Sequence, residues 1–264
     1  MLVPMRAILD AADKNGYAQG AFNVNAVCQV KAAVDVHQIL RSPAIIQGAD
    51  LANGFMGGRT DFANSTLEDK KAGAKNIGAA VKKYAADSDI PVALHLDHGK
   101  NFDSCIAAIE GGYTSVMIDG SSLPFDENVE LTREVVKYAH ERGVTVEGEL
   151  GVLAGVEDHV FAATSTYTNP LSAIDFFKKT GVDALAISYG TMHGANKGKN
   201  AVIRKEIAIA IKECMLHEGI EGYLVSHGSS TVPQYIVEEI NALGGEITNA
   251  YGCLLYTSPS PRDP

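Results

Sequence analysis

The sequence predicts an α/β fold, a (β/α)8 TIM barrel of parallel strands whose eighth strand is missing. First, short apolar runs alternate with longer segments of helical periodicity, which is typical of a parallel sheet. Second, no glycine-rich fingerprint follows the first apolar run, which argues against an open nucleotide-binding sheet. Third, unusual polar residues stand where the strands end, the position of catalytic groups in barrel enzymes.

The expected strands are mostly apolar without a polar face. This is typical of strands that are covered on both sides. Seven strands are expected, at residues 18–23, 43–47, 91–94, 115–118, 145–149, 184–188 and 222–225.

Two helices between these strands have recognisable signals. Asn169, followed by proline, is typical of a helix start, and Gly181 of a helix end. The expected buried stripe of this helix consists of Leu171, Ile174 and Phe177. A second stripe precedes Gly143 and consists of Val129, Thr132, Val135, Val136 and Ala139. Residues 51–69 have little periodicity and are expected to form a long, lid-like loop.

The predicted barrel occupies residues 1–252, and residues 253–264 form a tail that does not look native. Three prolines within the last six residues exclude an interior strand there, because proline cannot donate to a strand ladder. We therefore expect a chain truncated before its last strand. Such a chain would expose the edges of strands one and seven, and we expect it to be poorly active.

Composition limits the function classes. With 32 acidic and 22 basic residues, the net charge is -10, which argues against binding to nucleic acid or to an anionic membrane surface. No stretch approaches the roughly 18 apolar residues of a membrane span. The four cysteines are far apart and form no paired motif, which favours reduced thiols in the cytoplasm or an organellar stroma.

The strongest chemical motif is His95-Leu96-Asp97-His98-Gly99, which follows the third apolar run. Burying three ionisable groups is costly unless they are paired or bound to a metal. His193 and His227 each follow a later strand and precede a glycine. Histidines at the ends of strands three, six and seven would converge above the barrel. Three imidazoles with one open position describe a catalytic zinc site.

Two other features belong to the same end of the barrel. Glu147 and Glu149 alternate along strand five and therefore share one face, so Glu149 is expected to be an alternative metal ligand or a partner of a ligand histidine. The glycines beside His193 and His227 let backbone N–H groups approach an anion closely. Ser229 and Ser230 add hydroxyl donors, which favours a phosphate site near strand seven.

Together these motifs resemble the class II, zinc-dependent fructose-bisphosphate aldolase family. The resemblance runs in order along nearly the whole chain before the tail, and the combination of motifs is highly specific. The matching segments are residues 16–18, 21–25, 95–99, 147–151, 191–194, 227–230 and 249–252.

The resemblance implies roles for individual residues. His98, His193 and His227 would be the zinc ligands, with Glu149 as the alternative ligand. Asp97 would be the acid/base residue at the hydroxyl of the cleaved bond. Glu157 would be the mobile-loop carboxylate that takes a proton from the three-carbon ketone. The residues implied for substrate, phosphate or a monovalent cation (K⁺ or Na⁺) are Asn23, Gly194, Gly228, Ser229 and Ser230.

The implied reaction is the reversible aldol cleavage of fructose 1,6-bisphosphate to dihydroxyacetone phosphate and glyceraldehyde 3-phosphate through a zinc-stabilised enediolate. Three alternatives stay open: tagatose- or sedoheptulose-bisphosphate as substrate, a zinc hydrolase on the same barrel, and an inactive metal-binding fragment. The sequence departs from the family at residues 47–50, where many members carry a serine. Family members are usually homodimers or larger.

Overall fold

Seven parallel strands form a curled sheet in the computed structural model, in the order β1-β2-β3-β4-β5-β8-β9. The structure describes residues 1–152, 155–157, 160–162, 166–193, 202–228, 238 and 242. Within these residues no eighth parallel strand is present, and the sheet is an incomplete barrel, as predicted. The strands are β1 (Ala21–Asn23), β2 (Ala44–Ala49), β3 (Val92–Gly99), β4 (Ser115–Ile118), β5 (Thr145–Leu150), β8 (Ala184–Ile187) and β9 (Tyr223–Val225).

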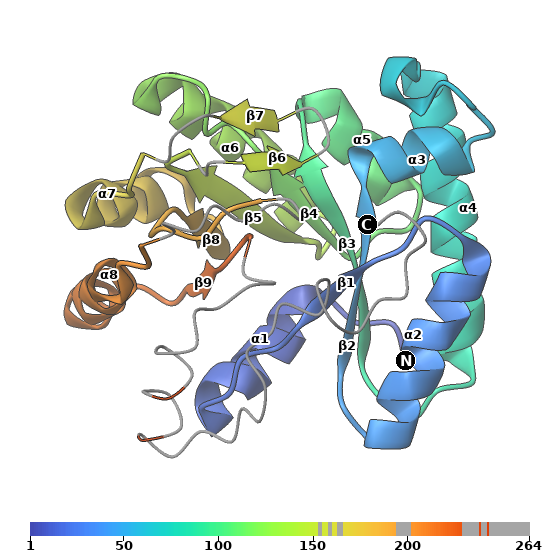
Figure 1. The fold of residues 1–264 in the computed structure, drawn as a ribbon, viewed down its shortest axis with the longest axis horizontal. Helices are drawn as coiled ribbons and strands as arrows, with labels where there is room; N and C mark the ends of the chain where they lie inside the picture. The colour runs from blue at the N-terminus through green and yellow to red at the C-terminus, as the bar shows by residue number, and fades with distance from the viewer. Residues whose placement is uncertain are drawn as a thin grey trace.

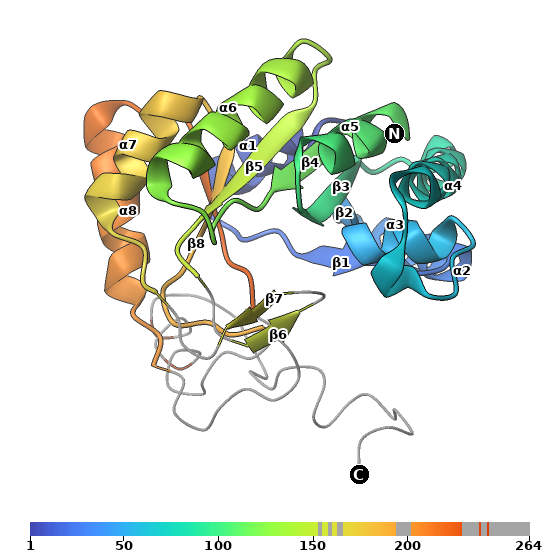
Figure 2. The same ribbon diagram turned by 90° about the horizontal axis from the view of Figure 1, so that it is seen from above.

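Helices cover the outer face of the curled sheet, as the two views in Figures 1 and 2 show. Strand residues such as Ile46, Leu94 and Val116 are fully buried against them. The covering elements are α2 (Val27–Leu40), α3 (Asp50–Met56), η1 (Phe62–Asn64), α4 (Leu67–Ala86), α5 (Phe102–Glu110), α6 (Phe125–His140), α7 (Pro170–Thr180) and α8 (Lys205–Glu218). Among the described helices, none is long and apolar enough to cross a membrane.

Helix α1 (Met5–Asn15) precedes the first strand and was not expected from the sequence. Its Met5 and Ile8 form a small separate core with Ile45 of β2 and Ala93 of β3. Both strand residues stand near the amino ends of their strands, so α1 packs against the end of the sheet opposite the polar motifs.

A two-stranded antiparallel hairpin, β6 (Gly155–Glu157) and β7 (Val160–Ala162), separates β5 from β8 in the chain. It was not expected either. The chain beside it is held by Thr168, whose hydroxyl donates to the Leu150 carbonyl and accepts from Ser188 N–H (2.8 Å). Thr168, in the chain after the hairpin, is therefore tied to the carboxyl ends of β5 and β8.

Three predictions about elements need correction. Residues 51–69 do not form a long loop: α3 and η1 occupy much of this stretch, and α4 begins at Leu67. The third strand does not end at residue 94 but continues through the histidine motif to Gly99. Helix α7 has the predicted ends, but Leu171 is 75% exposed, and the helix instead packs through Ala173, Ile174, Phe176 and Phe177.

The predictions for helix α6 and for the cysteines agree with the structure. Helix α6 buries the whole predicted stripe before Gly143. Cys28, Cys105 and Cys214 are free thiols in the part of the chain that the structure describes. The predicted tail, residues 253–264, lies outside the described residues.

Candidate active site

A bulge in β3 determines which side chains of the histidine motif face the interior of the barrel. Leu96 of β3 pairs with Val116 of β4, and the next pair is Gly99 with Ile118. Between these pairs β3 has two residues and β4 has one. One residue is therefore extra on β3, and His98 has a positive φ of 49°. A bulge re-aims side chains that would otherwise alternate between the two faces. This explains why the neighbouring residues Asp97 and His98 both face the interior.

The structure brings His98, His193 and His227 together. Their ring centroids lie 5.2 Å (His98–His193), 4.7 Å (His98–His227) and 5.9 Å (His193–His227) apart. With zinc–nitrogen bonds of about 2.0 Å and tetrahedral geometry, imidazole centroids would lie about 5.2 Å apart. The three rings are therefore close neighbours. Among the described residues, one group whose ligand atoms all lie within 4.8 Å of one another consists of Asp97, His98 and His227, and His193 is not a member of it.

Glycine is required beside His227. Gly228 has a φ of 62°, and a Cβ there would lie 2.5 Å from the backbone carbonyl of Met192. The loops that follow β8 and β9 are thus packed backbone to backbone. This close contact places His227 beside His193.

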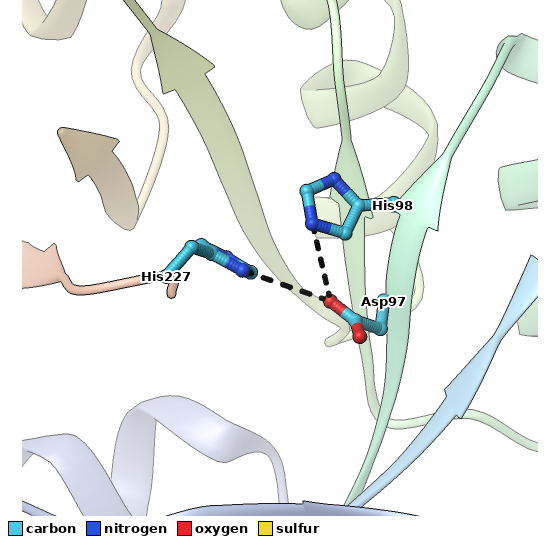
Figure 3. Close-up of side chains that lie close together, drawn as sticks. All are labelled: Asp97, His98 and His227. Carbon is cyan, nitrogen blue, oxygen red and sulfur yellow. Dashed lines mark ion pairs between the residues drawn. The ribbon is translucent and has the colours of Figure 1, made fainter. Parts of the chain in front are cut away.

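Asp97 lies against the histidines, and its two oxygens have different surroundings (Figure 3). Oδ2 accepts a hydrogen bond of 2.7 Å from Nδ2 of Asn23 on β1. Oδ1 lies 3.9 Å from Nε2 of His98 and 3.9 Å from Nδ1 of His227, and it has no hydrogen bond to any described residue. Burial opposes ionisation of Asp97, but the two imidazoles and the Asn23 amide lower its pKa below the usual value.

Behind His227 lies a buried carboxylate, Glu147 of β5. Its Oε1 lies 2.8 Å from Nε2 of His227, and its Oε2 lies 3.4 Å from Nε2 of His95. Burial disfavours the charged form of His227, but the bond to Glu147 raises its pKa above the ordinary value. Burial lowers the pKa of His95, which keeps that ring neutral.

The opposite side of the His98 ring faces two more carboxylates. Nδ1 of His98 lies 3.2 Å from Oδ2 of Asp119 and 3.7 Å from Oε2 of Glu149. Despite burial, the bond to Asp119 raises the pKa of His98 to about 10, and burial raises that of Glu149 to about 7. His98, Asp119 and Glu149 form a second group with the spacing of a metal site.

Asp119 directly follows the expected strand 115–118, but no role was assigned to it from the sequence. Burial opposes its ionisation, but the hydrogen bond with His98 lowers the pKa of Asp119. Ser121 adds two hydrogen bonds to its Oδ1, from N–H (3.1 Å) and from the hydroxyl (2.6 Å). The available signal was its position directly after residues 115–118, next to the strand that carries His98.

These groups open into a cavity of about 860 Å³, lined by Asn23, Asp97, His193 and His227 and reaching down to Met5 of α1. Its volume suits a small organic substrate.

Several predicted residues cannot be placed in this arrangement. Glu157 is the last residue of β6, and its side chain is outside the described part of the structure. Gly194, Ser229 and Ser230 lie outside the described residues. The roles of all the predicted site residues stay predictions.

Comparison with known proteins identifies the family. A sequence model described as fructose-bisphosphate aldolase class-II matches residues 3–253. The chain is 42% identical over 264 residues to a fructose-bisphosphate aldolase of Treponema pallidum, covering 95% of this chain and 76% of that protein. It is also 42% identical over 252 residues to a fructose-bisphosphate aldolase of Giardia intestinalis, covering 95% and 72% of the two chains.

Solved structures agree with this. A putative fructose-1,6-biphosphate aldolase of Coccidioides immitis superposes with a TM-score of 0.73 at 26% identity, covering 88% of this chain and 76% of that one. The YdjI aldolase of Escherichia coli K12 superposes with a TM-score of 0.70 at 28% identity, covering 90% and 77%. The chain belongs to the class-II fructose-bisphosphate aldolase family.

Proposed function

We propose that this chain catalyses the reversible aldol cleavage of fructose 1,6-bisphosphate to dihydroxyacetone phosphate and glyceraldehyde 3-phosphate, with zinc as its metal. Membership of a metal-dependent aldolase family supports the reaction class. The observation that carries the proposal is the meeting of two buried imidazoles and one partly buried imidazole, 4.7 to 5.9 Å apart by ring centroid, beside the carboxylate of Asp97.

His98, His193 and His227 would hold the zinc ion. Three nitrogen ligands with an open position are typical of catalytic zinc. A zinc ion bound there supplies Lewis-acid polarisation of the substrate's ketone oxygen. Glu149, close to Nδ1 of His98, would be an alternative ligand, since it forms a second group of metal-ligand spacing with His98 and Asp119.

Asp97 would move the proton at the hydroxyl of the cleaved bond. It would accept this proton during cleavage and return it during condensation. Asn23 holds Oδ2, and Oδ1 has no hydrogen bond to any described residue, so Oδ1 is the oxygen that would accept the proton. The lowered pKa of Asp97 keeps it ionised and ready to accept a proton at neutral pH.

Glu157 would exchange the proton at the carbon of the three-carbon ketone. The position of its backbone in β6, after the end of β5, supports this role. Gly228 packs against the backbone of Met192. Together with Asn23, Gly194, Ser229 and Ser230, it would contact the substrate phosphate or a monovalent cation, K⁺ or Na⁺.

Metal removal tests the proposal. Purified protein should contain zinc, cleave fructose 1,6-bisphosphate, lose at least about 90% of its activity after exposure to a chelator, and recover on addition of Zn²⁺. The matched assays use tagatose 1,6-bisphosphate and sedoheptulose 1,7-bisphosphate. Faster cleavage of either alternative would contradict the proposed substrate, and bound zinc without any cleavage would contradict the proposed activity.

A further inference from the structure

Glu147 lies between two imidazoles, only one of which belongs to the proposed metal site. Its side chain is 3% exposed. One carboxylate oxygen is 2.8 Å from Nε2 of His227, and the other is 3.4 Å from Nε2 of His95. On the far side, Nδ1 of His95 lies 2.8 Å from the hydroxyl of Ser115. A buried polar chain thus connects β4, β3 and β5 with the loop after β9.

Hydrogen-bonding capacity determines which nitrogen of His227 carries a proton. An ionised carboxylate only accepts hydrogen bonds, so the bond between Glu147 and His227 is donated by Nε2–H. A neutral imidazole has a single N–H, which leaves a lone pair on Nδ1. Nδ1 of His227 is also the nitrogen that lies 3.9 Å from Asp97, on the side of the proposed metal site.

The same reasoning applies to His95. If its Nε2–H points at Glu147, its Nδ1 accepts a hydrogen bond from the Ser115 hydroxyl. Both imidazoles then turn Nε2 toward one carboxylate. His227 is at hydrogen-bond distance from one oxygen, whereas Nε2 of His95 lies 3.4 Å from the other and makes no hydrogen bond to a described residue. Glu147 cannot rotate without losing one of the two contacts, and its orientation in turn limits the rotation of His227.

We propose that Glu147 is a positioning residue: supported by His95 and Ser115, it fixes His227 with Nε2 protonated, so that His227 would bind the metal through Nδ1. This inference rests on the proposed metal site. Partners of metal-bound histidines generally fix the tautomer and orientation of the ring, and their loss weakens metal affinity about 10–100-fold.

Glu147→Gln tests this role because it keeps the shape of the side chain and replaces one acceptor oxygen with an NH₂ donor. Glutamine has one acceptor oxygen, and its NH₂ group would face an N–H donor of the other histidine. The matched control is Glu130→Gln, the same substitution on the surface of α6, where the side chain is 70% exposed. Zinc affinity is measured by competition with a chromophoric chelator. We expect affinity about 10–100-fold weaker for Glu147→Gln and unchanged for Glu130→Gln.

A spectroscopic measurement on the zinc-loaded wild type tests the tautomer directly and does not depend on a variant. In ¹⁵N-histidine NMR spectra, His227 should show a protonated Nε2 and a metal-bound Nδ1. Coordination through Nε2 would overturn the inference. So would equal zinc affinity in the Glu147→Gln and Glu130→Gln variants.

Ser115→Ala provides a milder variant at the outer end of the polar chain. We expect it to weaken zinc affinity less than Glu147→Gln does, while keeping the same His227 tautomer. If Ser115→Ala weakened zinc affinity as much as Glu147→Gln does, this would contradict a role in which Ser115 and His95 act on His227 only by supporting Glu147. If the wild type binds no zinc, the proposed metal site itself is wrong, whereas binding with an Nε2 ligand contradicts only the positioning role.

Discussion

At the scale of single residues, the orientation of the Asp97 carboxylate depends on a hydrogen bond from one uncharged side chain, that of Asn23. The amide of Asn23 donates to Oδ2 at 2.7 Å, and no other described residue makes a hydrogen bond to this carboxylate. Hydrogen bonds to charged groups are worth about 1.5–3 kcal/mol, more than neutral ones. Asn23 therefore both orients Asp97 and favours its ionised form.

Removing this amide should slow catalysis without preventing folding. We expect Asn23→Ala to lower kcat about 10–100-fold, because the lost bond of about 1.5–3 kcal/mol corresponds to such a factor in rate. The matched control is Asn25→Ala, two residues further along and exposed. Steady-state assays of fructose 1,6-bisphosphate cleavage measure the effect. Equal kcat values for the two variants would contradict a role for Asn23 in orienting Asp97.

The sequence predicted that His98, His193 and His227 lie near one another and that Glu149 lies near a histidine, but it did not predict the contacts of Asp119 and His95. The roles of these residues stay predictions. His193 and His227 follow apolar runs and precede glycines, so strand ends alone bring them together. Asp119 and His95 acquire their contacts from strand pairing and from the bulge in β3, which no local pattern encodes. The wrong prediction for α7, in which Leu171 is exposed and Phe176 is buried, has a similar cause. Contacts with neighbouring helices determine which side of α7 is buried.

At the scale of elements, backbone contact between helices defines the region after β2. Gly73 of α4 lies where a Cβ would be 1.7 Å from the Asn53 carbonyl oxygen of α3. The capping box of Thr66 and Asp69 fixes the start of α4 just before this contact. Short α3 therefore depends on α4, and this explains why residues 51–69 lack a helical pattern of their own.

A side chain at this contact should separate the two helices. We expect Gly73→Ala to lower the free energy of unfolding by about 1–3 kcal/mol, because overpacking outweighs the better helix propensity of alanine. Lys75→Ala, at an exposed position of the same helix, is the matched control. Urea denaturation measures both variants. A Gly73→Ala variant at least as stable as the wild type would show that α3 can move away from α4 without cost.

The seven parallel strands and helices α6 and α7 could be predicted because apolar runs and helix caps are local signals, whereas α1, α3 and the β6–β7 hairpin were not expected. Asn169 caps α7 through its side chain, and Gly181 ends it with a φ of 68°. The end of β3 could not be predicted, because His95, Asp97 and His98 are polar residues buried inside the strand. The cost of burying these side chains is offset by their contacts with one another and with residues of β1, β5 and the loop after β9. These contacts form only when the sheet is assembled.

At the scale of the whole molecule, one carboxylate joins distant parts of the chain at the end of the sheet away from the site. Asp183, just before β8, accepts from Arg6 of α1 (2.9 Å), from His140 of α6 (2.8 Å) and from the Val146 N–H of β5 (2.8 Å). Its side chain is 6% exposed. The amino-terminal helix is thereby connected to both β5 and β8.

Stability should depend on pH through this network in two opposite ways. Burial opposes ionisation of Asp183, but its donors lower the pKa, so its contribution is present above about pH 4 and is lost as the pH falls. The hydrogen bond with Asp183 raises the pKa of His140, so that contribution is complete below about pH 6.5 and is lost as the pH rises through the folded-state value. Both contributions are present between these limits.

The histidine in this network provides the test. We expect His140→Ala to lower the free energy of unfolding more at pH 5.5 than at pH 9, because only the protonated imidazole adds a charge opposite Asp183. The matched control is His217→Ala, which removes an exposed histidine of α8 and should cost little stability. Urea denaturation at the two pH values measures each difference. A loss for His140→Ala that is equal at pH 5.5 and pH 9 would mean that the charge of His140 does not stabilise the connection between α1, α6 and the sheet.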